Sequence, residues 1–182
     1  MNEGLIPNRY AKALLKYALE KGEQEQEHVY ELMNRLSGSF ASTPALDTTL
    51  ANPFVAADQK IGLLMTAAGA EKTDEVFCDF LKLLRNNNRL PMSRAIALAY
   101  SDDYRKANNI YRVEVTAAAP MGQAEEKRLK NLIVSHLNGG TMEYEFKVDE
   151  SLIGGFTVKV GSEQLDASIK NELKQLKLRL LG

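Results

Sequence analysis

The spacing of apolar residues changes once along this 182-residue chain, and the change limits the folds that the chain can adopt. Up to about residue 108, apolar residues recur every third or fourth position, which places them on one face of an α-helix. From Tyr111 they alternate with polar residues, as in a β-strand with one buried face. We therefore expect a helical domain over residues 1–108 and an α/β domain over residues 109–182.

The first part of the chain predicts a bundle of about six helices. The second helix carries an apolar stripe at helical spacing, made of Val29, Leu32, Met33, Leu36 and Phe40. Gly69 is expected to end a later helix, and Thr73 is expected to cap the start of the next one. Pro91 is expected to begin the last helix, because the first turn tolerates a missing amide proton.

The second part predicts the order strand, helix, strand, strand, helix, and hence a fold of the class α followed by α/β. Strands are expected around residues 111–117, 142–148 and 156–160. The helix between the first two strands is expected to bury one side, formed by Leu129, Leu132, Ile133 and Leu137. A closing helix is expected from its stripe of Ile169, Leu173, Leu176 and Leu180, with Asp166 or Ser168 as its cap.

Charge and cysteine content exclude several classes of protein. There are 23 basic and 24 acidic residues, so the formal net charge of -1 attracts neither nucleic acid nor an anionic membrane surface. The single cysteine, Cys78, cannot form an internal disulfide and fits a reducing compartment such as the cytoplasm. No segment approaches the roughly 20 apolar residues of a membrane span, so we expect membrane association only through another protein.

Catalytic, cofactor and metal motifs are not found in the sequence, and we predict that the chain is not an enzyme. A nucleotide-binding loop with its lysine is missing, and Gly154-Gly155 precedes a strand although a dinucleotide site needs its glycines after one. His28 and His136 have no second ligand at helical spacing, and Cys78 is expected to be a buried inert thiol. An RNA-binding module and an enzyme with an unrecognised site are the alternative classes.

Two helices carry more apolar surface than a single stripe. The first has the neighbouring stripes Tyr10, Ala13, Leu14 and Tyr17, then Ala11, Leu15, Ala18 and Leu19. The fifth has the stripes Val76, Phe80 and Leu83, then Phe77, Leu81 and Leu84. Such a wide apolar arc indicates either burial on two sides of the helix or a groove for an amphipathic helix from another protein. The residues alone do not decide between these alternatives.

Five segments, in this order along the chain, resemble the family of the ATP synthase delta subunit and its mitochondrial counterpart, the oligomycin-sensitivity-conferring protein. They are NRYAKALLKYA at 8–18, NPF at 52–54, FLKLLRNNNRL at 80–90, VEVTAAAPM at 113–121 and VDESLIGGFTVKVGSEQLDASIKNELKQLKLRL at 148–180. The resemblance covers nearly the whole chain. It implies a non-catalytic stator protein, present as one copy per complex at the cytoplasmic face of the inner membrane.

The resemblance also implies two partners. The helical domain would hold the N-terminal helix of an alpha subunit in a groove between its first and fifth helices, lined by Tyr10, Ala13, Leu14, Tyr17, Phe77, Phe80, Leu81 and Leu84. The α/β domain would meet the C-terminal ends of the b subunits, with Gly154, Gly155 and Phe156 as the matching residues. An aspartate at Tyr10 or Phe80 is then expected to weaken alpha binding without loss of helix. The alternative is a helix-binding adaptor of another complex.

Overall fold

The computed structural model describes residues 4–137, 139–152, 154–161 and 163–168. They form two compact units that divide between Tyr104 and Arg105. We call them the helical unit and the α/β unit and describe each by itself. A mostly helical first part followed by an α/β part confirms the fold class expected from the change in apolar spacing.

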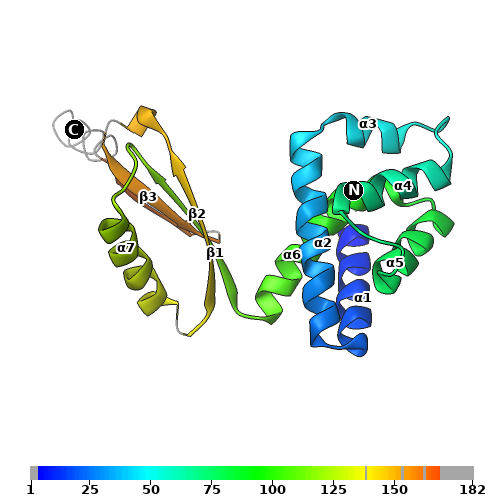
Figure 1. Cartoon of the computed structure of the whole chain (residues 1–182), viewed down its shortest axis with the longest axis horizontal. Coiled ribbons are helices and arrows are strands. Elements are labelled where there is room, and N and C mark those ends of the chain that lie inside the picture. Colours follow the sequence, from blue (N-terminus) through cyan, green and yellow to red (C-terminus); the bar gives the residue numbers. More distant parts are fainter. Residues whose placement is uncertain (1–3, 138, 153, 162, 169–182) are drawn as a thin grey trace. The chain divides into compact units, whose positions relative to one another are not determined.

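The helical unit is built from the helices that Figure 1 labels α1 to α6, with one short 3-10 helix before the last. In chain order these are α1 (Leu5–Lys21), α2 (Glu23–Ser42), α3 (Ala45–Ala51), α4 (Ala57–Ala68), α5 (Glu75–Asn86), η1 (Leu90–Met92) and α6 (Ser93–Ala107). The last turn of α6 lies beyond the division between the units.

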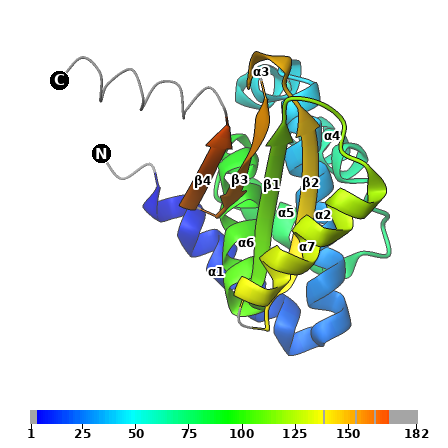
Figure 2. The ribbon, with the colours of Figure 1, turned by 90° about the vertical axis from the view of Figure 1, so that its left-hand side faces the viewer.

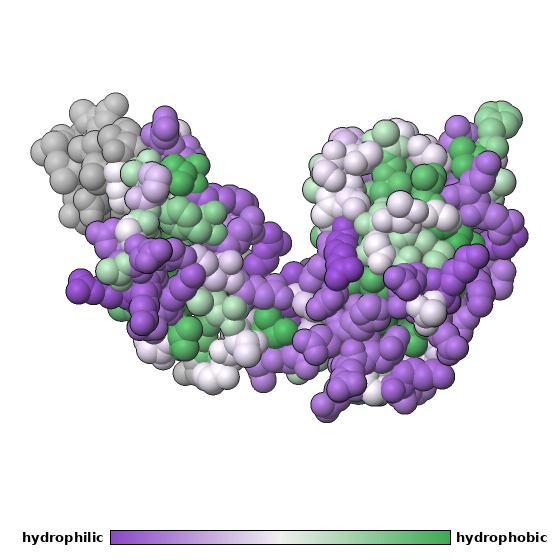
Figure 3. Space-filling model, viewed as in Figure 1, coloured by the Kyte–Doolittle hydropathy of each residue, from purple (hydrophilic) through white to green (hydrophobic). Residues whose placement is uncertain are grey.

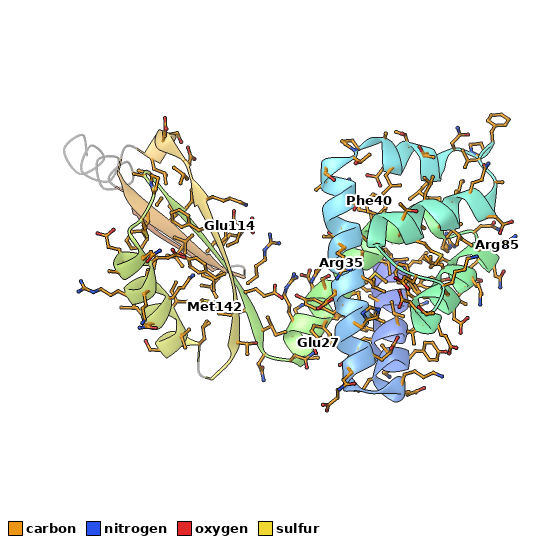
Figure 4. The ribbon with its side chains drawn as sticks, viewed as in Figure 1. Glu27, Arg35, Phe40, Arg85, Glu114 and Met142 are labelled. Atoms are coloured by element: carbon orange, nitrogen blue, oxygen red, sulfur yellow. The ribbon has the colours of Figure 1, made fainter. Side chains whose placement is uncertain are left out.

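Helix α2 supplies the centre of the helical unit and contacts both α1 and α4. Its predicted apolar stripe is confirmed, because every member is at most 2% exposed: Val29, Leu32, Met33, Leu36 and Phe40. Phe40 is labelled in Figure 4. Full burial of one such side chain contributes about 1.5–3 kcal/mol to stability. On α6, the Tyr104 ring stacks on that of Tyr30 at 4.1 Å, which fixes α6 against α2.

The ends of α4 and α5 show one correct and one wrong prediction. Gly69 follows α4 in the left-handed conformation at φ 66°, as expected for a helix C-cap. The cap of α5 is Asp74 and not Thr73. The Asp74 carboxylate accepts a hydrogen bond from the backbone amide of Glu71 at 2.7 Å, and its other oxygen lies 3.0 Å from Nε2 of His28. These contacts hold Asp74 outside the helix, so α5 begins one residue later than the prediction would have it.

The α/β unit is a four-stranded sheet in the order β2-β1-β3-β4. Its elements are β1 (Ile110–Ala117), α7 (Gln123–His136), β2 (Thr141–Val148), η2 (Glu150–Leu152), β3 (Gly155–Val160) and β4 (Glu163–Ser168). Strands β1 and β2 are parallel and joined through α7, whereas β3 pairs antiparallel with both β1 and β4. Figure 2 shows α7 across one face of the sheet.

The apolar core of the α/β unit lies between this sheet and α7. It consists of Val113, Val115, Ile133, Leu137 and Val158, with Met142, Tyr144, Phe146 and Phe156 among the half-buried side chains that pack against it. The other face of the sheet carries ion pairs, with Arg112 Nη2 3.0 Å from Glu145 and Lys147 Nζ 2.7 Å from Glu114. Met142, which packs against the core, and Glu114, on the charged face of the sheet, are both labelled in Figure 4.

One expectation for the α/β unit is wrong. Leu132 was expected on the buried side of α7, but its side chain is 59% exposed because it lies at the flank of the helix. Of the two caps expected for the closing helix, Asp166 lies inside β4, opposite Thr157 of β3, and Ser168 is the last residue of that strand. The predicted closing helix, with Ile169, Leu173, Leu176 and Leu180, lies outside the described residues.

Candidate partner-binding site

Helix α1 buries one narrow side and leaves a second apolar line accessible. Leu14 is 2% exposed and packs inside the helical unit. On the adjoining side of the helix, Tyr10 and Tyr17 are half-buried and Ala13 is exposed. Positions 10, 13 and 17 follow one another at three- and four-residue spacing, so they form one line along the helix surface. Of the four predicted α1 site residues, these three can contact a partner.

Helix α5 buries nearly the whole of its wide apolar arc. Phe77 and Leu84 are 0% exposed, Leu81 is 1% exposed and Phe80 is 6% exposed. These four predicted site residues fill the interior of the helical unit, so on α5 two-sided burial accounts for the second stripe. The exception is Leu83, which is 45% exposed. It belongs to the predicted apolar arc, but it was not among the predicted site residues.

A contact between side chains joins the accessible lines of the two helices, which lie against each other. The Tyr17 hydroxyl donates a long hydrogen bond of 3.5 Å to the carboxylate of Asp79, which lies one turn before Leu83 on α5. Tyr10, Ala13 and Tyr17 of α1 and Leu83 of α5 therefore border one surface, which we call the α1–α5 strip. Its apolar area is bounded by polar groups, as expected for a site that receives an amphipathic helix.

On the side of the α1–α5 strip that α5 forms, the charged side chains pair with one another. Lys82 Nζ lies 2.8 Å from the Asp79 carboxylate, and this hydrogen bond lowers the pKa of the Asp79 carboxyl and raises that of the Lys82 amine. The Lys21 ammonium lies 5.7 Å from the centre of the Tyr17 ring. One turn beyond Lys82, Arg85 pairs with Asp58 of α4 at 2.6 Å. Figure 4 labels Arg85 on α5.

The predicted site residues of the α/β unit have clear structural roles. Gly155, the first residue of β3, has a φ of 79°, a conformation that favours glycine. Its carbonyl oxygen accepts a hydrogen bond from the backbone amide of Ala118 at 3.2 Å. Phe156 packs against the apolar core of the unit, and Gly154 is half-buried just before the strand. Contact of Gly154, Gly155 and Phe156 with a partner stays a prediction.

Other candidate groups do not assemble a catalytic or metal site within the described residues. Cys78 is half-buried and not fully buried as expected, and partial burial raises the pKa of its thiol. His28 is held by Asp74. No three His, Cys, Asp or Glu side chains among the described residues are placed to hold a metal ion. Nor does any helix in the described part of the chain have the length and apolar character needed to span a bilayer.

A second exposed apolar area lies on the helical unit away from α1. The Phe54 ring is 95% exposed in the turn between α3 and α4, where the side chain of Asn52 accepts a hydrogen bond from the Phe54 amide at 2.9 Å. Leu63 of α4 is 40% exposed. Figure 3 shows apolar surface around α4, and hydrophilic surface over the opposite end of the helical unit. Phe54 belongs to the NPF segment of the family resemblance, and its exposed ring was not among the predicted site residues.

Comparisons with known proteins give one consistent result. Residues 6–180 match the family model described as ATP synthase delta (OSCP) subunit. The ATP synthase subunit delta of Phocaeicola vulgatus is 36% identical over 179 residues, which cover 98% of this chain and 95% of the relative. That of Bacteroides fragilis is 35% identical over 182 residues, covering 100% of this chain and 96% of the relative. That of Synechococcus sp. is 32% identical over 171 residues, which cover 94% of this chain and 92% of the relative.

A solved structure shares the fold. A chain of the cryo-EM structure of the Toxoplasma gondii mitochondrial ATP synthase hexamer superposes with a TM-score of 0.74, and the match covers 97% of each chain. The two sequences are 24% identical, so this likeness concerns the fold.

Proposed function

The chain belongs to the ATP synthase delta (OSCP) subunit family, and on this premise we propose that it holds an alpha subunit with its helical unit and the peripheral stalk with its α/β unit. It is a non-catalytic stator subunit of the rotary ATP synthase. Torque from the rotor would turn the catalytic head unless a stator resisted it. The subunit therefore acts by staying bound, and its activity is mechanical.

The accessible α1–α5 strip is the observation that carries the alpha-binding proposal. Ala13 lets a partner backbone approach closely, and the half-buried tyrosines Tyr10 and Tyr17 each offer an apolar ring for contact and a hydroxyl for a polar partner. An amphipathic helix seated on this strip would contact Leu83 from the other side. A nanomolar complex requires roughly -12 kcal/mol, which an interface of ordinary size can supply. The occupant that we propose is the N-terminal helix of an alpha subunit.

The proposed stalk contact rests on the family alone. The C-terminal ends of the b subunits would bind the domain over residues 109–182, as the helical domain over residues 1–108 binds the head. One copy of the subunit would serve each complex, at the cytoplasmic face of the inner membrane, and the complex would provide its only link to the bilayer. The β3 side of this domain contains Gly154, Gly155 and Phe156. It is therefore the first place to test for contact with the b subunits.

Aspartate at the α1–α5 strip tests the alpha-binding proposal. Tyr10→Asp and Ala13→Asp place a charge on an apolar contact surface, so each is expected to weaken binding about tenfold or more. The ligand is a synthetic peptide with the N-terminal segment of the alpha subunit from the same organism, and isothermal titration calorimetry with the full chain gives the dissociation constant. Neither side chain is fully buried, so far-UV circular dichroism should not change.

Leu19→Asp is the matched control for these variants. Leu19 also lies on α1 and is 52% exposed, but it belongs to the other apolar stripe of the helix. The control should bind the peptide as the unaltered chain does. If Leu19→Asp weakens binding as much as Tyr10→Asp, or if Tyr10→Asp has no effect, the alpha helix binds elsewhere.

A further inference from the structure

The outer edge of the α1–α5 strip is positively charged. Arg9 and Lys16 are exposed and lie on either side of Ala13, four residues before it and three after it, which places both beside the line of Tyr10, Ala13 and Tyr17. Neither side chain forms an ion pair with another described residue. Lys12, which is also exposed, lies three residues after Arg9 and four before Lys16, so this side of α1 presents three cations.

The remaining charges near the strip do not cancel this edge. Asp79 on α5 is already engaged by Lys82 and by the Tyr17 hydroxyl. Glu20 is exposed four residues after Lys16 and offsets part of the positive charge at the last turn of α1, where the Lys21 ammonium lies over the Tyr17 ring. The positive charge is thus concentrated at the part of the strip that Arg9 and Lys16 border, near Tyr10 and Ala13.

We propose that the helix seated on the α1–α5 strip carries carboxylate side chains along the edge that faces Arg9 and Lys16. This inference rests on the proposed function, and it adds the charge and the direction of the bound helix. Exposed charge pairs contribute modestly to affinity, but they accelerate association and penalise the wrong orientation. A helix with its acidic edge against α5, or with a basic edge against α1, would lose these contacts. The apolar strip supplies affinity, and the charged edge selects which way the helix lies.

Charge reversal on α1 tests the inference with the same alpha peptide and the full chain. Arg9→Glu and Lys16→Glu are each expected to weaken binding about fivefold at low ionic strength, chiefly through slower association in stopped-flow fluorescence. The loss should shrink to about twofold or less near 0.5 M salt, because screening removes interactions between exposed charges. Arg128→Glu is the control, since Arg128 is an exposed cation on α7 of the α/β unit and lies outside the strip. It should leave binding unchanged.

A peptide with exchanged charge completes the test. Replacing the acidic side chains of the peptide with lysine should weaken binding to the unaltered chain and restore binding to Arg9→Glu. Tight binding by an alpha segment without carboxylates, or equal losses in Arg128→Glu and Lys16→Glu, would overturn the inference while the proposed function stands. If the unaltered chain does not bind the alpha peptide at all, the proposed function itself fails and the inference falls with it.

Discussion

Phe80→Asp is expected to unfold the helical unit, whereas Leu83→Asp, one turn later on α5, should leave it folded. Phe80 is 6% exposed and packs inside the unit, so its loss costs about 3–5 kcal/mol before the buried carboxylate is counted. An unpaired buried charge adds several kcal/mol, and a domain of this size has only about 5–15 kcal/mol of stability. Thermal unfolding followed by far-UV circular dichroism should show loss of most of the cooperative helical transition.

Leu83→Asp is the matched control for Phe80→Asp. It introduces the same charged side chain on the same helix, at a leucine that is 45% exposed, so it should retain the helical transition and weaken alpha binding. Equal melting temperatures for the two variants would contradict the burial of Phe80. The comparison also corrects the expectation that aspartate at Phe80 would weaken binding without loss of helix. Loss of binding in that variant would report unfolding, whereas loss in Leu83→Asp would report the contact surface.

Gly140→Ala is expected to destabilise the α/β unit by about 1–3 kcal/mol through steric overlap. A Cβ atom at Gly140 would lie 2.6 Å from the backbone oxygen of Asn109 and would also clash with the Tyr111 ring. The exposed Tyr111 ring can move away, but the Asn109 oxygen is held because it accepts a hydrogen bond from the Thr141 amide at 3.1 Å. Hydrogen exchange of the amides in β1 and β2 should accelerate, as those strands meet at this point.

The same substitution at Gly62 provides the control for Gly140→Ala. Gly62 lies within α4, and a Cβ atom there meets open space. Alanine is a better helix former than glycine, so Gly62→Ala should stabilise the helical unit by about 0.5–1 kcal/mol. Opposite signs for the two variants are the expected result. An unchanged exchange rate in Gly140→Ala would show that the β1–β2 junction can relax around a methyl group.

The change in apolar spacing was sufficient to predict the order of most elements. Residue 111 begins the alternation, and β1 begins one residue earlier, at Ile110. The alternation also predicted which face of β1 is buried, since Val113 and Val115 are 0% exposed. This succeeded because a strand that covers a core on one side leaves a clear pattern in its own residues.

Strand β4 could not be predicted in the same way. Its two apolar residues, Leu165 and Ala167, alternate with polar ones over too few positions to predict a strand, and the segment is a strand because its backbone pairs with β3 from Val160 to Gly155. Such pairing is a property of two segments together, and the residues of one segment do not reveal it. The cap of α5 shows the same limit, since Asp74 is fixed by contacts with Glu71 and with His28 from another helix.

The candidate site was only partly predictable for a related reason. Apolar spacing indicates how much of a helix avoids water, but it does not indicate which neighbouring helix covers it. On α5 the helical unit itself covers both stripes and leaves only Leu83 accessible, whereas on α1 the line of Tyr10, Ala13 and Tyr17 stays accessible. The distinction required the packing of the whole unit.

The position of β1 in its sheet bears on how this subunit carries load. The chain passes from α6 into β1, and β1 is the one strand of the α/β unit hydrogen-bonded to β2 on one side and to β3 on the other. Tension that reaches the α/β unit through the polypeptide would therefore act on a strand held by backbone hydrogen bonds along both edges. Withdrawing β1 requires the bonds to both neighbouring strands to break, whereas an outer strand is held along one edge. The α/β unit is thus entered at the place where its sheet best resists extraction.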